Sequence, residues 1–484
     1  MFYFYLNLEG MMRILYMAMS FLWIINFPST IKAQTLQQKI RNAYSQFEHD
    51  PNLQHAVTSL TVLNANTGAL VFSKQDNIGL ATASTLKTIT SAAAYYILGA
   101  DYVYETKLLY TGSINNGVLD GDIVIKGSGD PSLGSDRFDT TKGTVLLAKW
   151  TDAIRQAGIK KINGSIIGDD LLFDGQTAGP RWIWQDMGSY YGAGVSGLNW
   201  RENLVDAQIR PGDKVGAATS LQSTTPNISY LKLVNESTTG VAGSGDKIYP
   251  YSAPYSSIIY LRGTYGIDLK KPVQLALPDA GYDAALRLQL ALENKGIAVQ
   301  QPATTAKLLN ISGKDKLEEG QLLWSHTSPK LADLVYWFNQ ESINLYGEAL
   351  LKTMALKQHK ETETEKAALL LRDFWVNKLG LAKGAIRIYD GSGLSPEDRV
   401  TTMAMARILW SIKKEPWFDS YYKSIPVYNG MKMKSGTIGG VLGYAGYQKA
   451  ADGTELVFSL LINNYEGTAY RMRQQMFKLL NTLK

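Results

Sequence analysis

The chain contains no cysteine and only four histidines among its 484 residues. The missing thiols exclude disulfides, iron–sulfur clusters, thiolate zinc sites and a cysteine nucleophile. The histidines are widely separated, none belongs to an HExxH motif, and we therefore expect no metal site. They are His49, His55, His326 and His359.

Long runs of charge are also missing. The 49 basic and 43 acidic residues are scattered and leave a net charge of +6, so nothing indicates a nucleic-acid partner. There is no GxxxxGK[ST] phosphate loop, and no GxSxG elbow that would carry a Ser-His-Asp triad. The hydrophobic fraction of 45% is typical of a globular protein with a substantial core.

An apolar run stands near the N-terminus. Arg13 is followed by about 14 mostly apolar residues, then by Pro28 and the small residue Ala33. These proportions predict a signal peptide over residues 1–33, cleaved after Ala33, and export to the periplasm. The run is shorter than the roughly 20 residues of a membrane helix, and no later stretch predicts a stable membrane span.

In the rest of the chain the predicted secondary structure changes twice. Hairpin and helix patterns come first, short strands separated by Gly, Asn and Asp turns fill residues 102–278, and helices dominate again from residue 279. This pattern predicts an α/β catalytic domain made of residues 34–101 and 279–484. A long β-rich insertion over 102–278, itself two small domains, splits that catalytic domain.

Ser84 and Lys87 form a Ser-x-x-Lys motif at the start of a predicted helix. Residues three apart share a helical face, so the hydroxyl and the amine can meet. A lysine held among apolar neighbours loses hydration, which lowers its pKa and lets the neutral amine take the serine proton. A second copy, Ser229 and Lys232, lies in a strand-like stretch where residues three apart point to opposite faces, so we expect no dyad there.

A Ser-x-Asn motif opens another predicted helix. The hydroxyl of Ser342 can relay a proton, and the amide of Asn344 can bind a substrate backbone. The alternative for Ser342 is an ordinary helix N-cap. A rival Ser-x-Asn at Ser113 and Asn115 lies between glycines and is expected to be a hairpin tip.

A basic, glycine-containing strand is predicted near the C-terminus, and its residues are Lys434, Ser435, Gly436 and Thr437. A lysine and hydroxyls on such a strand can hold a carboxylate, because glycine lets a substrate approach the backbone. The N–H groups of Thr437 and Ser84 can together form an oxyanion hole. The alternative is a basic edge strand without a catalytic role.

The order and spacing of these motifs resemble those of the active-site serine penicillin-recognising enzymes. Together with the long insertion they resemble the D-alanyl-D-alanine carboxypeptidase/endopeptidase family, the class C low-molecular-mass penicillin-binding proteins. Further stretches carry the same resemblance: 127–131, 168–170, 191–193 with 198–199, 344–348 and 390–395. The resemblance implies an α/β penicillin-recognising (serine β-lactamase-like) transpeptidase fold.

The same resemblance implies the chemistry. The chain is expected to hydrolyse peptidoglycan stem peptides and cross-links through an acyl-enzyme, to need no cofactor and to be inhibited by β-lactams. Ser84 is then the acylated nucleophile and Lys87 its base, while Ser342 and Asn344 complete the proton network and grip the substrate.

Substrate binding is implied for the C-terminal motif and for the insertion. Residues 434–437 would hold the terminal carboxylate, with Ser435 in place of the usual threonine. Asp169 would contact the amino group of a diamino acid side chain, and Asp170 is an equal candidate by spacing. Pro396 and Gly439 depart from residues found in some relatives, which indicates a different recognition of the peptide stem.

Two alternatives share the fold, a non-hydrolytic sensor of β-lactams or cell wall and an esterase or β-lactamase. Turnover of a D-Ala-D-Ala peptide distinguishes them from a peptidase. A group of aromatic residues in the insertion is expected to pack rather than to stack on sugar rings. Its members are Trp182, Trp184, Tyr190, Tyr191 and Trp200.

Overall fold

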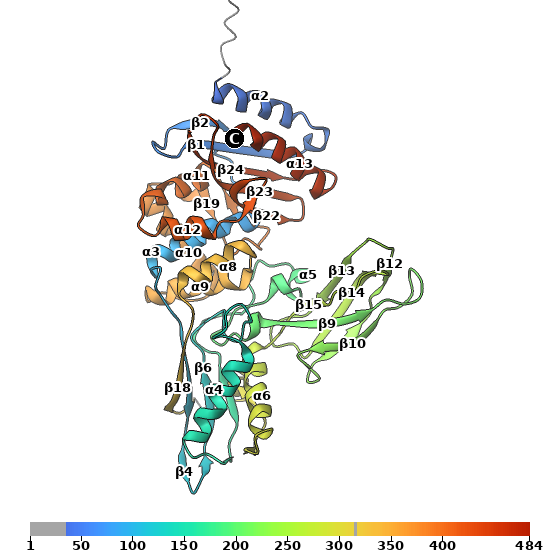
Figure 1. Cartoon of the computed structure of the whole chain (residues 1–484), viewed down its shortest axis with the longest axis vertical. Coiled ribbons are helices and arrows are strands. Elements are labelled where there is room, and N and C mark those ends of the chain that lie inside the picture. Colours follow the sequence, from blue (N-terminus) through green and yellow to red (C-terminus); the bar gives the residue numbers. More distant parts are fainter. Residues whose placement is uncertain (1–34, 314–316) are drawn as a thin grey trace, which may run out of the picture.

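The computed structural model describes residues 35–313 and 317–484. It is an elongated body with an arm that projects sideways from its middle (Figure 1). The predicted signal peptide lies outside the described residues. Within them, no helix has both the length and the apolar character that crossing a membrane requires.

An antiparallel sheet forms one end of the body, with strand order β2-β1-β24-β23-β22-β21. It joins the two ends of the chain, because β1 pairs along its whole length with β24. Both faces of β1, β23 and β24 are buried along most of their length, and on β1 the buried positions include the polar residues Ser59 and Thr61. The strands are β1 (Val57–Asn64), β2 (Leu70–Lys74), β21 (Val427–Tyr428), β22 (Met431–Ile438), β23 (Val441–Lys449) and β24 (Glu455–Asn463).

Two terminal helices cover one face of this sheet, α2 (Leu36–Glu48) and α13 (Ala469–Leu480). Each buries an apolar stripe at helical spacing, Ile40 with Tyr44 on α2 and Met472 with Met476 on α13. The other face packs on a cluster of helices that share one core. These are α3 (Lys87–Ile97), α8 (Leu331–Gln340), α9 (Asn344–Lys357), α10 (Thr364–Leu379), α11 (Thr402–Ser411) and α12 (Phe418–Ser424).

A second core lies in the other half of the body, around a sheet of order β17-β8-β6-β3-β18 and the helices α4 and α6. The larger elements are β3 (Glu105–Tyr110), β6 (Ile123–Lys126), β8 (Ile166–Asp169), β17 (Thr304–Thr305), β18 (Gln321–Thr327), α4 (Gly143–Gln156), α6 (Ala280–Glu293) and α7 (Ala306–Ile311). Short strands extend its far end, namely β4 (Ser113–Asn115), β5 (Val118–Asp120), β7 (Lys161–Ile162) and β16 (Ala298–Val299).

The arm, residues 204–276, consists of two small sheets (Figure 1). Their strands are β9 (Leu204–Arg210), β10 (Ser220–Thr225), β11 (Lys232–Asn235), β12 (Thr238–Gly240), β13 (Asp246–Tyr251), β14 (Ile258–Gly266) and β15 (Val273–Ala276). A short helix, α5 (Trp184–Met187), packs on β13 where the arm meets the body.

The stretch after residue 278 packs with the second core. Strands β16 to β18 pair with strands of its sheets, and helix α6 buries Ala284 and Leu288 in its core. The predicted boundary at 278 assigns these elements to the catalytic domain. The sequence could not place them otherwise, because a helical pattern does not reveal which sheet the helix will cover. We therefore propose that the insertion ends near Thr327. Residues 102–327 are called the inserted region below, and the other described residues the catalytic core.

Candidate active site

Ser84 lies in a tight turn of 3₁₀ helix, η2 (Ala83–Leu86), that leads into α3. Glycine allows strand β22 to pass directly beside this turn. A methyl group added at Gly436 would lie 2.5 Å from the carbonyl oxygen of Thr82 and 2.9 Å from the backbone nitrogen of Thr85. The Ser-x-x-Lys and Lys-Ser-Gly motifs, 350 residues apart by number, are therefore neighbours in the fold.

Lys87 is fully buried beneath Ser84. Its Nζ lies 2.9 Å from Ser84 Oγ, 2.6 Å from Asn344 Oδ1 and 2.8 Å from the carbonyl oxygen of Ser392. Burial lowers the pKa of Lys87 to about 7, although the buried carboxyl groups of Asp390 and Glu348 act in the opposite direction. A neutral amine is thus accessible near neutral pH.

The three contacts of Lys87 determine where its lone pair points. The oxygens of Asn344 and Ser392 can only accept hydrogen bonds, so they occupy both hydrogens of the neutral amine. The lone pair is left facing the Ser84 hydroxyl, which can donate its proton to it. The arrangement is that of a serine nucleophile with an adjacent general base.

The orientation of Asn344 is set by the inserted region. Its Nδ2 donates to the carbonyl oxygen of Tyr191 at 2.7 Å, which leaves Oδ1 to accept from Lys87. Asn344 is the first residue of α9. Ser342, two residues earlier, has a left-handed backbone with φ 58° and is therefore not a helical residue.

Lys434 forms the opposite wall of the site from strand β22 and is also fully buried. Its Nζ donates to Ser342 Oγ at 3.0 Å and to the carbonyl oxygen of Ser435 at 3.0 Å. Burial and the nearby Lys87 amine lower the pKa of Lys434 well below its usual value. The negative charge of an arriving carboxylate would offset the cost of keeping the Lys434 amine charged in a buried place.

The far end of the Lys-Ser-Gly-Thr strand is open to solvent. Thr437 is exposed, and its hydroxyl accepts from Arg473 Nη2 at 3.0 Å. Arg473 lies on α13 and belongs to none of the sequence motifs. It adds a second cation beside the residues predicted to hold a carboxylate.

A buried turn at residues 390–395 closes the site from below. The carboxylate of Asp390 accepts from the backbone N–H groups of Ser392, Gly393 and Ser395. The indole Nε1 of Trp182, from the inserted region, donates to the same carboxylate at 2.9 Å. In the sequence this stretch is marked only by the family resemblance, and the contact of the Ser392 carbonyl with Lys87 could not be predicted, because any residue supplies a backbone carbonyl.

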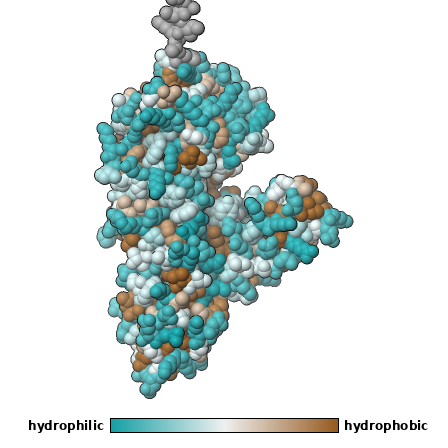
Figure 2. Space-filling view, viewed as in Figure 1, coloured by the Kyte–Doolittle hydropathy of each residue, from teal (hydrophilic) through white to brown (hydrophobic). Residues whose placement is uncertain are grey.

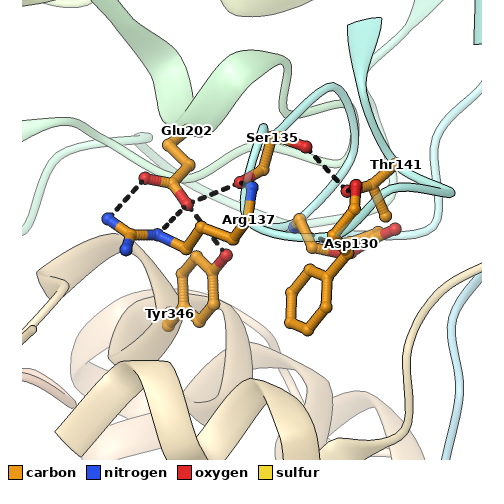
Figure 3. A network of polar contacts seen from close by, with 8 residues as sticks. Asp130, Ser135, Arg137, Thr141, Glu202 and Tyr346 are labelled. Atoms are coloured by element: carbon orange, nitrogen blue, oxygen red, sulfur yellow. Dashed lines mark hydrogen bonds and ion pairs between the residues drawn. The ribbon is translucent and has the colours of Figure 1, made fainter. Parts of the chain in front are cut away.

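A buried polar network joins the inserted region to α9 (Figure 3). Glu202 accepts from Arg137 Nε at 2.7 Å, from Ser135 Oγ at 2.8 Å and from Tyr346 Oη at 3.0 Å. Tyr346 lies two residues after Asn344, so this network anchors the helix end that carries Asn344. Glu202 occupies a left-handed turn with φ 56°, a strained conformation retained where the surroundings demand it.

The predicted residue Asp169 lies apart from the motifs described above. It ends β8, pairs across the sheet with Lys126 and lines a surface hollow with Leu172. Within the described residues no hydrogen bond joins it to Ser84 or Lys87. Asp170 is buried instead, accepts from the backbone N–H of Lys307, and has its pKa raised to about 6 by burial.

Histidine, cysteine and carboxylate side chains do not form a cluster of three or more suited to a metal ion in residues 35–313 and 317–484.

Comparisons with known proteins agree on one family. The family model described as the D-Ala-D-Ala carboxypeptidase 3 (S13) family matches residues 40–483. The chain is 25% identical to a D-alanyl-D-alanine carboxypeptidase of Actinomadura sp. (strain R39), covering 89% of this chain and 82% of the relative. It is 26% identical to D-alanyl-D-alanine carboxypeptidase DacB of Haemophilus influenzae, covering 83% and 84%.

A solved structure shares the fold. Penicillin-binding protein 4 (dacB) of Haemophilus influenzae matches with a TM-score of 0.75 and 22% identity, over 90% of this chain and 97% of that one. The same protein complexed with a β-lactam matches with a TM-score of 0.70 and 21% identity, over 90% and 98%. The predicted fold class, an α/β penicillin-recognising domain, is confirmed.

Proposed function

The chain belongs to the D-Ala-D-Ala carboxypeptidase 3 (S13) family, a family of serine peptidases, and we propose that it removes the terminal D-alanine from peptidoglycan stem peptides. One observation carries this proposal. The Lys87 amine lies 2.9 Å from the Ser84 hydroxyl, with both of its hydrogens committed to other acceptors.

In the acylation step, Ser84 Oγ attacks the carbonyl carbon of the penultimate D-alanine while Lys87 takes the hydroxyl proton. The N–H groups of Ser84 and Thr437 stabilise the oxyanion. As the C–N bond breaks, the proton passes to the leaving amine through Lys87 and the hydroxyl of Ser342. The terminal D-alanine departs, and water then hydrolyses the ester on Ser84.

Substrate binding follows from the charges around the nucleophile. Lys434, Ser435, Gly436 and Thr437 hold the terminal carboxylate, with Arg473 close by. The carboxylate offsets the burial that lowers the Lys434 pKa. Asn344 contacts the peptide backbone, and Asp169 meets the amino group of a diamino acid in the stem.

Two extensions of this activity use the same atoms. If the leaving amine belongs to a cross-linked strand, the reaction becomes endopeptidase cleavage. β-Lactams present a carbonyl beside a carboxylate and acylate Ser84, which the β-lactam complex of the Haemophilus influenzae relative supports. Peptidoglycan lies outside the cytoplasm, so the proposed function requires export, in agreement with the predicted signal peptide.

The test combines a labelled penicillin with purified muropeptides. We expect covalent labelling of the wild-type protein, no labelling of Ser84→Ala, and release of D-alanine from monomeric muropeptides detected by mass spectrometry. Equal labelling of both proteins would exclude Ser84 as the nucleophile. Labelling without any product would instead favour the non-hydrolytic sensor, and ester or nitrocefin turnover without peptide products would favour an esterase or β-lactamase.

A further inference from the structure

Four members of the aromatic group in the inserted region divide into two sets in the structure, and the fifth, Tyr191, is half-buried. Trp182 and Trp200 are buried, at 6% and 1% exposure, and pack as expected. Trp184 and Tyr190 are each 55% exposed, which is high for such large rings. Burial therefore does not explain why these two positions carry aromatic residues.

The exposed rings are held rigidly from one side. Trp184 meets Tyr251 of β13 in an edge contact, with centroids 5.0 Å apart and planes at 65°. Tyr190 meets Tyr191 in the same way, at 5.1 Å and 84°. An edge contact covers at most one face of a ring, so with 55% of each residue exposed, Trp184 and Tyr190 each keep an apolar face that their aromatic neighbour does not cover.

The two rings belong to elements that lead to the catalytic residues, since the turn that carries Tyr190 packs on α9 and the helix that carries Trp184 packs on that turn. Tyr190 and Tyr191 belong to the turn η3 (Tyr190–Gly192), and the Tyr191 carbonyl is the acceptor that orients Asn344 at 2.7 Å. The turn folds back on α5, since Gly192 lies against the Asp186 carbonyl with no room for a side chain. Helix α5 lies where arm and body meet (Figure 1), and the surface is deeply notched there (Figure 2).

We propose that Trp184 and Tyr190 form a subsite for the glycan chain to which the stem peptide is attached. The inference rests on the proposed function, because only a stem peptide brings a sugar to this place. An extended stem of about five residues spans at most about 18 Å, so its sugar stays near the nucleophile. Flat aromatic faces suit the C–H face of an N-acetylhexosamine ring, and the residues that follow Trp184 in the sequence, Gln185 and Asp186, are polar and half-buried.

The experiment compares D-alanine release from a free pentapeptide with release from the same peptide on an N-acetylglucosaminyl-N-acetylmuramyl tetrasaccharide. We expect wild-type kcat/KM to be roughly tenfold higher for the glycan-linked substrate, as one or two stacked rings provide. Trp184→Ala should abolish this preference and leave release from the free peptide unchanged. Trp184→Phe should restore part of the preference.

Tyr470→Ala is the matched control, since Tyr470 is 73% exposed on α13 and should affect neither substrate. If Trp184→Ala lowers both rates equally, or neither, the glycan subsite is refuted while the peptidase function stands. If the wild-type protein releases D-alanine from neither substrate, the proposed function itself fails. Binding can also be measured without catalysis, by a pull-down with insoluble peptidoglycan of the Ser84→Ala protein and of the Ser84→Ala, Trp184→Ala double variant. Equal retention of the two proteins would refute the glycan subsite.

Discussion

In the catalytic core, the buried Lys87 amine faces a nucleophile and two carboxyl groups, whereas two carboxyl groups of the inserted region, Asp130 and Asp279, accept from their own backbone. Lys87 lies near the carboxyl groups of Glu348 and Asp390, and burial raises the Glu348 pKa to about 8. In the inserted region, Asp130 and Asp279 each accept from a backbone N–H two or three residues later. Burial raises their pKa values as well, to about 6 and 7.

A shifted pKa therefore marks burial, and chemistry requires more. The carboxyl groups of Asp130 and Asp279 stabilise a turn and a helix start. In the core, a base with a lowered pKa touches a nucleophile, and its remaining hydrogens are occupied by fixed acceptors. The comparison predicts that mutations change acylation where the side chain contacts Lys87, directly or through the turn at 390–395, and that equally buried positions without such a contact change stability alone.

The largest expected effect is that of Lys87→Ala. Removal of the general base should slow acylation by a labelled penicillin roughly 10²- to 10⁴-fold while the protein still folds. Lys352→Met is the matched control, because Lys352 is also buried, with a pKa lowered to about 8, but donates only to backbone carbonyls. The acylation rates of the wild type and both variants are measured by stopped-flow or gel assay. A normal rate in Lys87→Ala would show that another base acts.

The pH dependence of acylation follows from the same lysine. Only the neutral amine accepts the proton, so the rate should fall as pH drops below the Lys87 pKa of about 7. Between pH 8 and pH 5 we expect a loss of roughly 100-fold. A rate that is flat over this interval, or one that still rises tenfold per unit above pH 9, would contradict a lowered pKa for Lys87.

A smaller effect tests the contact between the two regions. Trp182→Phe removes the donor to the Asp390 carboxylate, whose turn supplies the Ser392 carbonyl to Lys87. We expect acylation to slow about tenfold, in line with one hydrogen bond to a charged group, and its pH midpoint to move. Trp150 is a buried ring stacked on Trp200 inside the inserted region. The control variant Trp150→Phe should therefore change neither the acylation rate nor its pH midpoint. A pH midpoint that stays fixed in Trp182→Phe would reduce Trp182 to a packing residue.

The sequence predicted the core better than its surroundings. The apolar residues of 402–411 and 455–463 are spaced as in a helix and a buried strand, and α11 and β24 span those same residues. Ser84 and Lys87 are in contact because residues three apart meet on a helical turn. The contacts from Tyr191 and Ser392 could not be predicted, because any residue supplies a backbone carbonyl and only the fold decides where it points.

The smallest expected effect lies in the inserted region, at Asp279. Its carboxylate caps α6 by accepting from the backbone N–H of Tyr282, and burial raises its pKa from the usual 3.8 to about 7. A raised carboxyl pKa contributes stability below pH 3.8, and this contribution is lost as the pH rises through 7. Asp279→Asn keeps the cap without the charge, so it should stabilise the protein above pH 7 by on the order of 1 kcal/mol and not below pH 4. Chemical denaturation at both pH values measures this difference. Penicillin acylation should be unchanged, and a slowed acylation would show that the buried carboxyl groups of the two regions are coupled after all.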